Sequence, residues 1–139
     1  MKKNDIKNSV DMFLYKAIVD FNSGKCLLDN FENKDIEIDI EKIYFDFQQS
    51  VEKLLKSLIT HNGIEIKKTH DLEELINICL KNNINLIENI EQFIDLNEYA
   101  VEGRYDIICD DINDAPAYID LIELFIEFTK KEIIKVPTK

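Results

Sequence analysis

The strongest constraint on the fold is the stretch over residues 40–80, which carries two successive helical patterns. In its first part, apolar residues recur at spacings of three, four and seven, which is typical of one stripe on an amphipathic helix over 40–60. These positions are Ile40, Ile43, Tyr44, Phe47, Val51, Leu54, Leu55 and Leu58. The opposite face carries Gln48, Gln49, Glu52, Lys53 and Lys56. The rest of the chain is expected to pack as helices around this element.

A turn and a second helix follow the long one. His61-Asn62-Gly63 ends the long helix, because glycine adopts the left-handed conformation at low cost. Asp71 stands three residues before Glu74 in a capping-box-like pattern, which predicts a helix over 71–81. Its apolar stripe consists of Leu72, Leu75, Ile76, Cys79 and Leu80.

Three further helices are predicted around this pair. The first covers 5–22 and is stopped by Asn22-Ser23-Gly24, and residues 25–38 are predicted as a loop with a short helical turn near its start. Another helix covers 86–102. The last covers 114–133, because proline is favourable in a first turn. The sequence therefore predicts an all-α, up-and-down antiparallel bundle of about five helices, in a single domain over 1–139.

The last helix carries more apolar surface than the outer helix of a solitary bundle needs. Its two apolar flanks consist of Tyr118, Ile119, Leu121, Ile122, Phe125, Ile126 and Ile133. A face of this width predicts a partner helix from a second subunit, and hence a homodimer.

Composition and charge narrow the classes of function. The 139 residues, 45% of them apolar, are enough for one core. The net charge of −11 repels nucleic-acid phosphates and favours a basic protein partner. Cys26, Cys79 and Cys109 show no disulfide or zinc spacing. No stretch is apolar enough to span a membrane or to serve as a signal core, so a cytoplasmic protein without a metal or cofactor is expected.

Arg104 is the first candidate for a binding role. It is the only arginine among 17 basic residues, and its planar guanidinium suits a phosphate or a carboxylate. The alternative is an ion pair with Glu102 or Asp106 that fixes the local turn. Both interpretations are open at the level of sequence.

The second candidate is Thr69-His70-Asp71. His70 at a helix N-terminus favours an anion, or it packs across the turn while Thr69 or Asp71 caps the helix. The acidic run at 110–114 suits either oxygen ligation of Mg²⁺ or a solvated loop. No glycine-rich phosphate loop, nucleophile elbow or metalloprotease motif occurs.

Three ordered motifs together resemble the HEPN family (higher eukaryotes and prokaryotes nucleotide-binding domain). They are Gln49-x-x-Glu52-Lys53-x-x-Lys56, Lys68-Thr69-His70-Asp71-Leu72-x-x-Leu75 after Gly63, and Tyr99-x-x-x-x-Arg104-Tyr105. The resemblance spans nearly the whole chain. It implies a helical bundle that dimerises. Bacterial and archaeal members are often encoded beside a minimal nucleotidyltransferase, in a two-gene system that resembles a toxin–antitoxin pair.

The resemblance also implies a site, from which this chain departs. Many HEPN proteins are metal-independent ribonucleases with an arginine followed, after four to six residues, by a histidine. Cys109, Asp110 and Asp111 stand where that histidine is expected. Without it, no imidazole follows Arg104 to act as an acid or base. The leading hypothesis is therefore a non-catalytic dimeric module that binds a nucleotide or a nucleotidyltransferase. Its candidate ligand-binding residues are Lys53, Lys56, His70, Arg104 and Tyr105.

Two alternatives remain. In the first, the chain is a divergent, metal-independent HEPN ribonuclease toxin in which His70 acts with Arg104. In the second, it is a dimeric scaffold without a ligand. RNA binding by the free chain is not expected from its charge.

Overall fold

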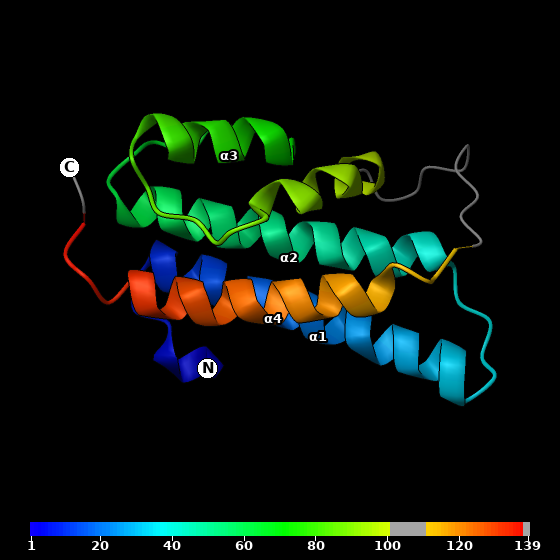
Figure 1. The fold of residues 1–139 in the computed structure, drawn as a ribbon. Helices are drawn as coiled ribbons and strands as arrows, with labels where there is room; N and C mark the ends of the chain where they lie inside the picture. Colours follow the sequence, from blue (N-terminus) through cyan, green and yellow to red (C-terminus); the bar gives the residue numbers. More distant parts are fainter. Residues whose placement is uncertain (101–110, 138–139) are drawn as a thin grey trace.

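The computed structural model describes residues 1–100 and 111–137, and all regular structure in these ranges is helical (Figure 1). The α-helices are α1 (Ser9–Asn33), α2 (Ile40–His61), α3 (Leu72–Lys81) and α4 (Ala115–Glu132). Two 3₁₀ helices, η1 (Lys3–Asp5) and η2 (Ile90–Tyr99), complete the described part. The prediction of an all-α bundle is confirmed.

Helix α2 lies at the centre and packs against α1, α3, η2 and α4 (Figure 1). Its apolar stripe is fully buried, with Ile43, Phe47 and Leu54 at zero exposure. The face opposite the stripe is covered as well, since Gln48 and Glu52 are also buried. A polar row on the central helix is thus enclosed by the fold, where buried polar groups must find partners.

Helices α1 and α2 run antiparallel and approach closely. The Ser50 hydroxyl donates a hydrogen bond to the carbonyl oxygen of Ala17 (2.8 Å), and the Ser57 hydroxyl donates to that of Val10 (3.0 Å). The order α1, α2, η2, α4 follows the predicted up-and-down alternation (Figure 1).

Helix α3 departs from that alternation. Residues 64–71 return along α2, so α3 begins beside the middle of α2, where His70 contacts Glu52. The chain just after α3 lies beside the end of α2, where Ile84 and Leu58 line one small pocket. Helix α3 therefore runs in the same direction as α2. This pair departs from the alternation expected of the bundle as a whole, because the long connection leaves room for the chain to turn back first.

The predicted bounds of the first helix are wrong at both ends. Asn8 caps α1, since its side-chain oxygen accepts a hydrogen bond from the Asp11 N–H (2.9 Å), and α1 continues through Gly24 to Asn33. Gly24 does not end the helix. It lies against the Phe47 ring, which a Cβ at this position would meet at 2.6 Å. Glycine serves close packing here rather than chain reversal.

The other bounds were mostly predicted well. Helices α2, α3 and α4 match their predicted ranges, and Gly63 has the expected left-handed conformation (φ 75°). The helix predicted over 86–102 instead begins at Ile90, after Asn89 with φ 65°, and is 3₁₀ in form. Its predicted end beyond residue 100 lies outside the described residues.

Candidate functional site

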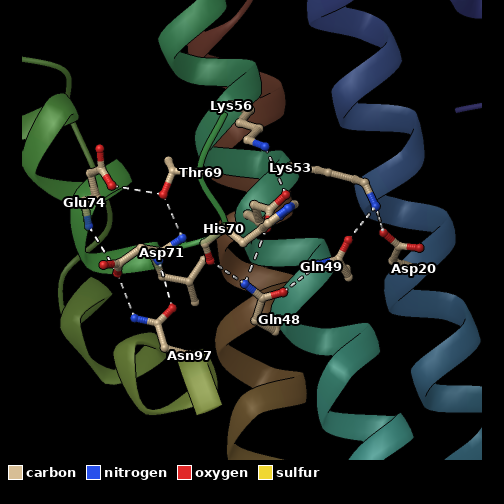
Figure 2. A network of polar contacts seen from close by, with 12 residues as sticks. Asp20, Gln48, Gln49, Lys53, Lys56, Thr69, His70, Asp71, Glu74 and Asn97 are labelled. Carbon is tan, nitrogen blue, oxygen red and sulfur yellow. Dashed lines mark hydrogen bonds and ion pairs between the residues drawn. The ribbon is translucent and has the colours of Figure 1, made fainter. Parts of the chain in front are cut away.

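The candidate site is a polar cluster on the middle of α2, between α1 on one side and residues 67–71 on the other (Figure 2). Gln48, Glu52 and Lys56 follow one another at i, i+4 spacing, so their side chains lie on one face of the helix. Gln49 and Lys53 form the neighbouring row, and the Gln49 amide donates to the side-chain oxygen of Gln48 (2.7 Å). Helix geometry alone therefore sets the order of these groups.

The centre of the cluster is the buried carboxylate of Glu52, whose side chain is 4% exposed. Lys56 Nζ lies 3.1 Å from one carboxylate oxygen, and His70 Nδ1 lies 2.9 Å from the other. Gln48 Nε2 approaches that second oxygen at 3.5 Å. A buried charge is tolerated when it is paired and hydrogen-bonded, and both oxygens of Glu52 meet this condition.

The segment that carries His70 is held in place by hydrogen bonds to α2, α3 and η2. Its carbonyl oxygen accepts a hydrogen bond from Gln48 Nε2 (2.9 Å). Asp71 caps α3, since its carboxylate accepts from two backbone N–H groups of the first turn. Asn97 of η2 donates to the same Asp71 oxygen (2.9 Å; Figure 2). Three elements, α2, α3 and η2, thus fix the segment that carries His70.

The side chain of His70 points across to α2, and the N-terminus of α3 is capped by Asp71. Of the two interpretations of this motif, packing across the turn describes the observed contacts. The imidazole is nevertheless 67% exposed. An exposed imidazole held by a buried carboxylate is an arrangement in which a protein orients a proton acceptor.

The two candidate lysines each face a carboxylate. Lys56 pairs with Glu52, and Lys53 forms a close ion pair with Asp20 of α1 (Figure 2). Lys53 also lies 3.5 Å from the side-chain oxygen of Gln49. The side chain of Lys56 is only 13% exposed, and that of Lys53 is 21% exposed. The cluster is therefore nearly balanced in charge.

Arg104 and Tyr105 lie in the stretch 101–110, outside the described residues, as do Cys109 and Asp110. The predicted relation of Arg104 to His70 or to the nearby acids therefore stays a prediction. Tyr99, just before this stretch, is half-buried against Tyr44, with ring centroids 5.1 Å apart.

Apart from the polar cluster, the structure has a cleft where α2, η2 and the start of α4 meet. This cleft of about 550 Å³ is lined by Tyr44, Ile94, Asp95, Glu98, Tyr99, Asp111, Asp114 and Tyr118. Burial raises the pKa of Tyr118 to about 12, with further contributions from Asp95, Asp114 and Glu98. The sequence had indicated Tyr99 and the acidic run, but not their meeting with Tyr44 and Tyr118.

Sequence patterns showed only part of the cluster. The i, i+4 spacing indicated the Glu52–Lys56 pair. Nothing in the spacing indicated that His70 would reach the same carboxylate, or that Asp20 would reach Lys53 from 33 residues away. Both contacts depend on tertiary packing.

Within residues 1–100 and 111–137, no group of His, Cys, Asp and Glu side chains is placed to hold a metal ion. In the same ranges, no helix has the length and apolar character to cross a membrane. Cys26 and Cys79 are free thiols.

Together, these observations define an all-α bundle whose central amphipathic helix, α2, carries a polar cluster around the buried Glu52. The chain belongs to the HEPN domain family, whose model matches residues 12–133. No curated protein and no solved structure matches the chain.

Proposed function

We propose that this HEPN chain is a non-catalytic module that partners a minimal nucleotidyltransferase, or binds a nucleotide, within a toxin–antitoxin-like two-gene system. Membership in the HEPN family supports the two-gene system, because bacterial and archaeal members are often encoded beside a minimal nucleotidyltransferase. The free thiols of Cys26 and Cys79 fit a reducing cytoplasm.

The observation that carries the protein-partner branch of this proposal is the pairing of the lysines. Lys53 and Lys56 were candidates for phosphate contacts, yet each already faces a carboxylate, of Asp20 and Glu52 respectively. A polynucleotide would have to displace these partners while approaching a chain of net charge −11. The charge balance favours a basic protein surface over RNA as the partner.

The test is co-expression with a minimal nucleotidyltransferase, taken from a neighbouring gene where one is encoded there. We expect the two chains to elute together at low salt and to separate as salt screens their opposite charges. Separate elution at low salt would contradict the partner role.

The nucleotide branch is tested by thermal unfolding with ATP or GTP. A ligand that binds only the folded state raises the melting temperature. If Arg104 belongs to the site, Arg104→Ala should remove either the rise in melting temperature or the complex with the nucleotidyltransferase. If Arg104→Ala changes neither nucleotide binding nor partner binding, Arg104 is excluded from the site. If the wild type binds neither a nucleotide nor the nucleotidyltransferase, the scaffold alternative is left.

We further propose that the chain forms a homodimer through α4. Ile122, Phe125 and Ile126 face the core, whereas Leu121 and Phe128 are only partly buried and Leu124 is 56% exposed. Leu121, Leu124 and Phe128 lie at i, i+3 and i+7, and so form an outer apolar stripe.

Light scattering should give twice 16.3 kDa for the wild type. Leu124→Glu should give a monomer, while Leu80→Glu, at 57% exposure on α3, serves as the matched control. A monomeric wild type would contradict the proposed homodimer.

A second candidate function is the divergent ribonuclease. The specific observation in its favour is the contact of His70 with the buried Glu52 carboxylate, since a general base must be oriented toward the hydroxyl it deprotonates. Incubation with a mixed RNA pool in EDTA should then show cleavage by the wild type. His70→Ala and Arg104→Ala should each abolish it, and intact RNA throughout would exclude this candidate.

A further inference from the structure

We propose that the cleft between α2, η2 and the start of α4 binds an aliphatic polyamine, an extended organic cation whose ammonium groups are joined by short methylene chains. The cleft combines tyrosine rings with carboxylates, the two kinds of group that attract such a cation. Its volume of about 550 Å³ lies in the range of small-molecule sites. This inference goes beyond the proposed function and does not depend on the nucleotidyltransferase partner.

Three aromatic rings from three elements line the cleft. Tyr44 of α2 is buried, whereas Tyr99 of η2 and Tyr118 of α4 are half-buried. The centroid of the Tyr44 ring lies 5.1 Å from that of Tyr99 and 5.9 Å from that of Tyr118. The Tyr44 and Tyr118 rings meet at 78°, so the cleft offers aromatic surface in more than one plane. The Tyr44 hydroxyl donates to the carbonyl oxygen of Asp111 (2.9 Å), which fixes the central ring.

The carboxylates of the cleft come from two elements. Asp95 and Glu98 belong to η2, whereas Asp111 and Asp114 lie just before α4. All four residues are exposed, while the central Tyr44 is buried, so the acids form the rim and the rings the floor.

Two of the rim carboxylates favour a ligand with more than one charge. Within residues 1–100 and 111–137, the side chains of Asp95 and Asp114 make no hydrogen bond or ion pair. In the same ranges, the lining of the cleft includes no lysine, arginine or histidine. Each of the two carboxylates can accept its own ammonium group, which favours a cation with at least two charges over a single lysine side chain.

The pKa of Tyr118 agrees with this arrangement. Burial raises it to about 12, with further contributions from Asp95, Asp114 and Glu98. Three rim carboxylates thus act on one ring of the floor. The potential in the cleft is negative, and the faces of the rings add to its attraction for a cation.

The aromatic floor distinguishes a polyamine from a metal ion. Methylene groups can be buried against the rings while the ammonium groups reach the carboxylates, as the stems of lysine side chains do on protein surfaces. Mg²⁺ keeps several of its waters and gains nothing from the rings. Selectivity for the organic cation is therefore the signature of this site.

The experiment is an NMR titration of the full chain with spermidine. Aromatic ring currents shift nearby protons, so we expect upfield shifts of the spermidine methylene signals. Mg²⁺ at the same ionic strength should reverse these shifts only slightly. A wild type that leaves the methylene signals unchanged at millimolar spermidine, or equal displacement by Mg²⁺ and by unlabelled spermidine, would overturn the proposal.

Variants test the two kinds of group separately. Tyr118→Leu should raise the Kd for spermidine by about 2–5-fold and reduce the ring-current shifts, while Tyr15→Leu, half-buried outside the cleft, should do neither. Equal effects of these two variants would contradict a role for the floor.

The rim is tested by the double variant Asp95→Asn/Asp114→Asn, which should raise the Kd by at least about tenfold, since two charge-assisted hydrogen bonds are lost. Its control, Asp29→Asn/Glu65→Gln, removes the same charge from exposed positions outside the cleft and should have little effect. Equal losses in both would reduce the binding to general attraction by the net charge of −11.

Butylamine separates a polyamine from a lysine side chain, because it carries one ammonium group on a similar methylene chain. We expect it to bind at least about tenfold more weakly than spermidine, because it can satisfy only one of the two carboxylates. Equal affinity for the two amines would overturn the assignment to a polyamine in favour of a lysine side chain of a partner protein.

Discussion

At the scale of single residues, the molecule shows how one glycine allows two helices to approach. Gly24 lies inside α1 and is buried against Phe47, whose side chain is fully enclosed in the core. Helix propensity favours alanine over glycine by about 1 kcal/mol. The missing Cβ must therefore be worth more in packing than it costs in helix stability.

We predict that Gly24→Ala destabilises the fold by about 1–3 kcal/mol, as overpacked cores do. The added Cβ would stand 2.6 Å and 2.9 Å from two atoms of the Phe47 ring. Urea unfolding followed by circular dichroism measures the effect. Ser23→Ala, exposed on the same helix, should be neutral or slightly stabilising. A Gly24→Ala variant more stable than the wild type would show that the ring yields.

At the scale of elements, the start of α3 is the point at which three segments are joined. Asp71 caps the helix and also accepts a hydrogen bond from Asn97 of η2, while the preceding His70 contacts Glu52 of α2. The short helix α3 has ten residues, a length at which isolated helices are marginal in water. Its stability therefore depends on this cap and on packing.

Asp71→Ala should destabilise the protein by about 1–2 kcal/mol, because it removes the N-cap of α3. Hydrogen exchange should increase first over residues 72–81. Asp71→Asn keeps an oxygen that can accept from the same donors, so its stability should stay close to that of the wild type. Equal losses in both variants would mean that the negative charge, not the cap, is the stabilising feature.

At the scale of the whole molecule, two weak acids, the buried Cys79 and the half-buried Tyr118, connect the fold to pH. Burial raises the pKa of the Cys79 thiol from 9.0 to about 12. Burial and nearby carboxylates raise that of Tyr118 from 10.0 to about 12. Both groups keep their protons in the folded chain at a pH where the unfolded chain releases them. Folded stability must then fall as pH rises.

We predict that the free energy of unfolding falls between pH 9 and pH 12, by up to about 1.4 kcal/mol per pH unit for the fully buried Cys79. At neutral pH both groups are protonated in both states and contribute no slope. Tyr118→Phe, with Tyr15→Phe as its control, should flatten the part of the curve between pH 10 and pH 12. Equal slopes in both variants would dissociate Tyr118 from the effect.

The sequence alone determined the helices whose apolar periodicity is strong. Helices α2, α3 and α4, the cap at Asp71 and the turn at Gly63 all depend on residues close together in the chain. Local signals failed at Gly24, where a distant ring decides the residue type, and in the region after residue 86, where helical structure begins only after the left-handed Asn89. Periodicity reports which face is buried, but not what covers it.

The tertiary structure decided the site. The sequence placed Glu52 and Lys56 on one helix face and placed His70 before the next helix, but it could not relate them. Their contact exists because residues 64–71 fold back along α2, and the Lys53–Asp20 pair exists because α1 lies on the other side. Both depend on the direction in which the chain returns. That direction is set by the packing of the whole bundle and leaves no periodic trace in the sequence.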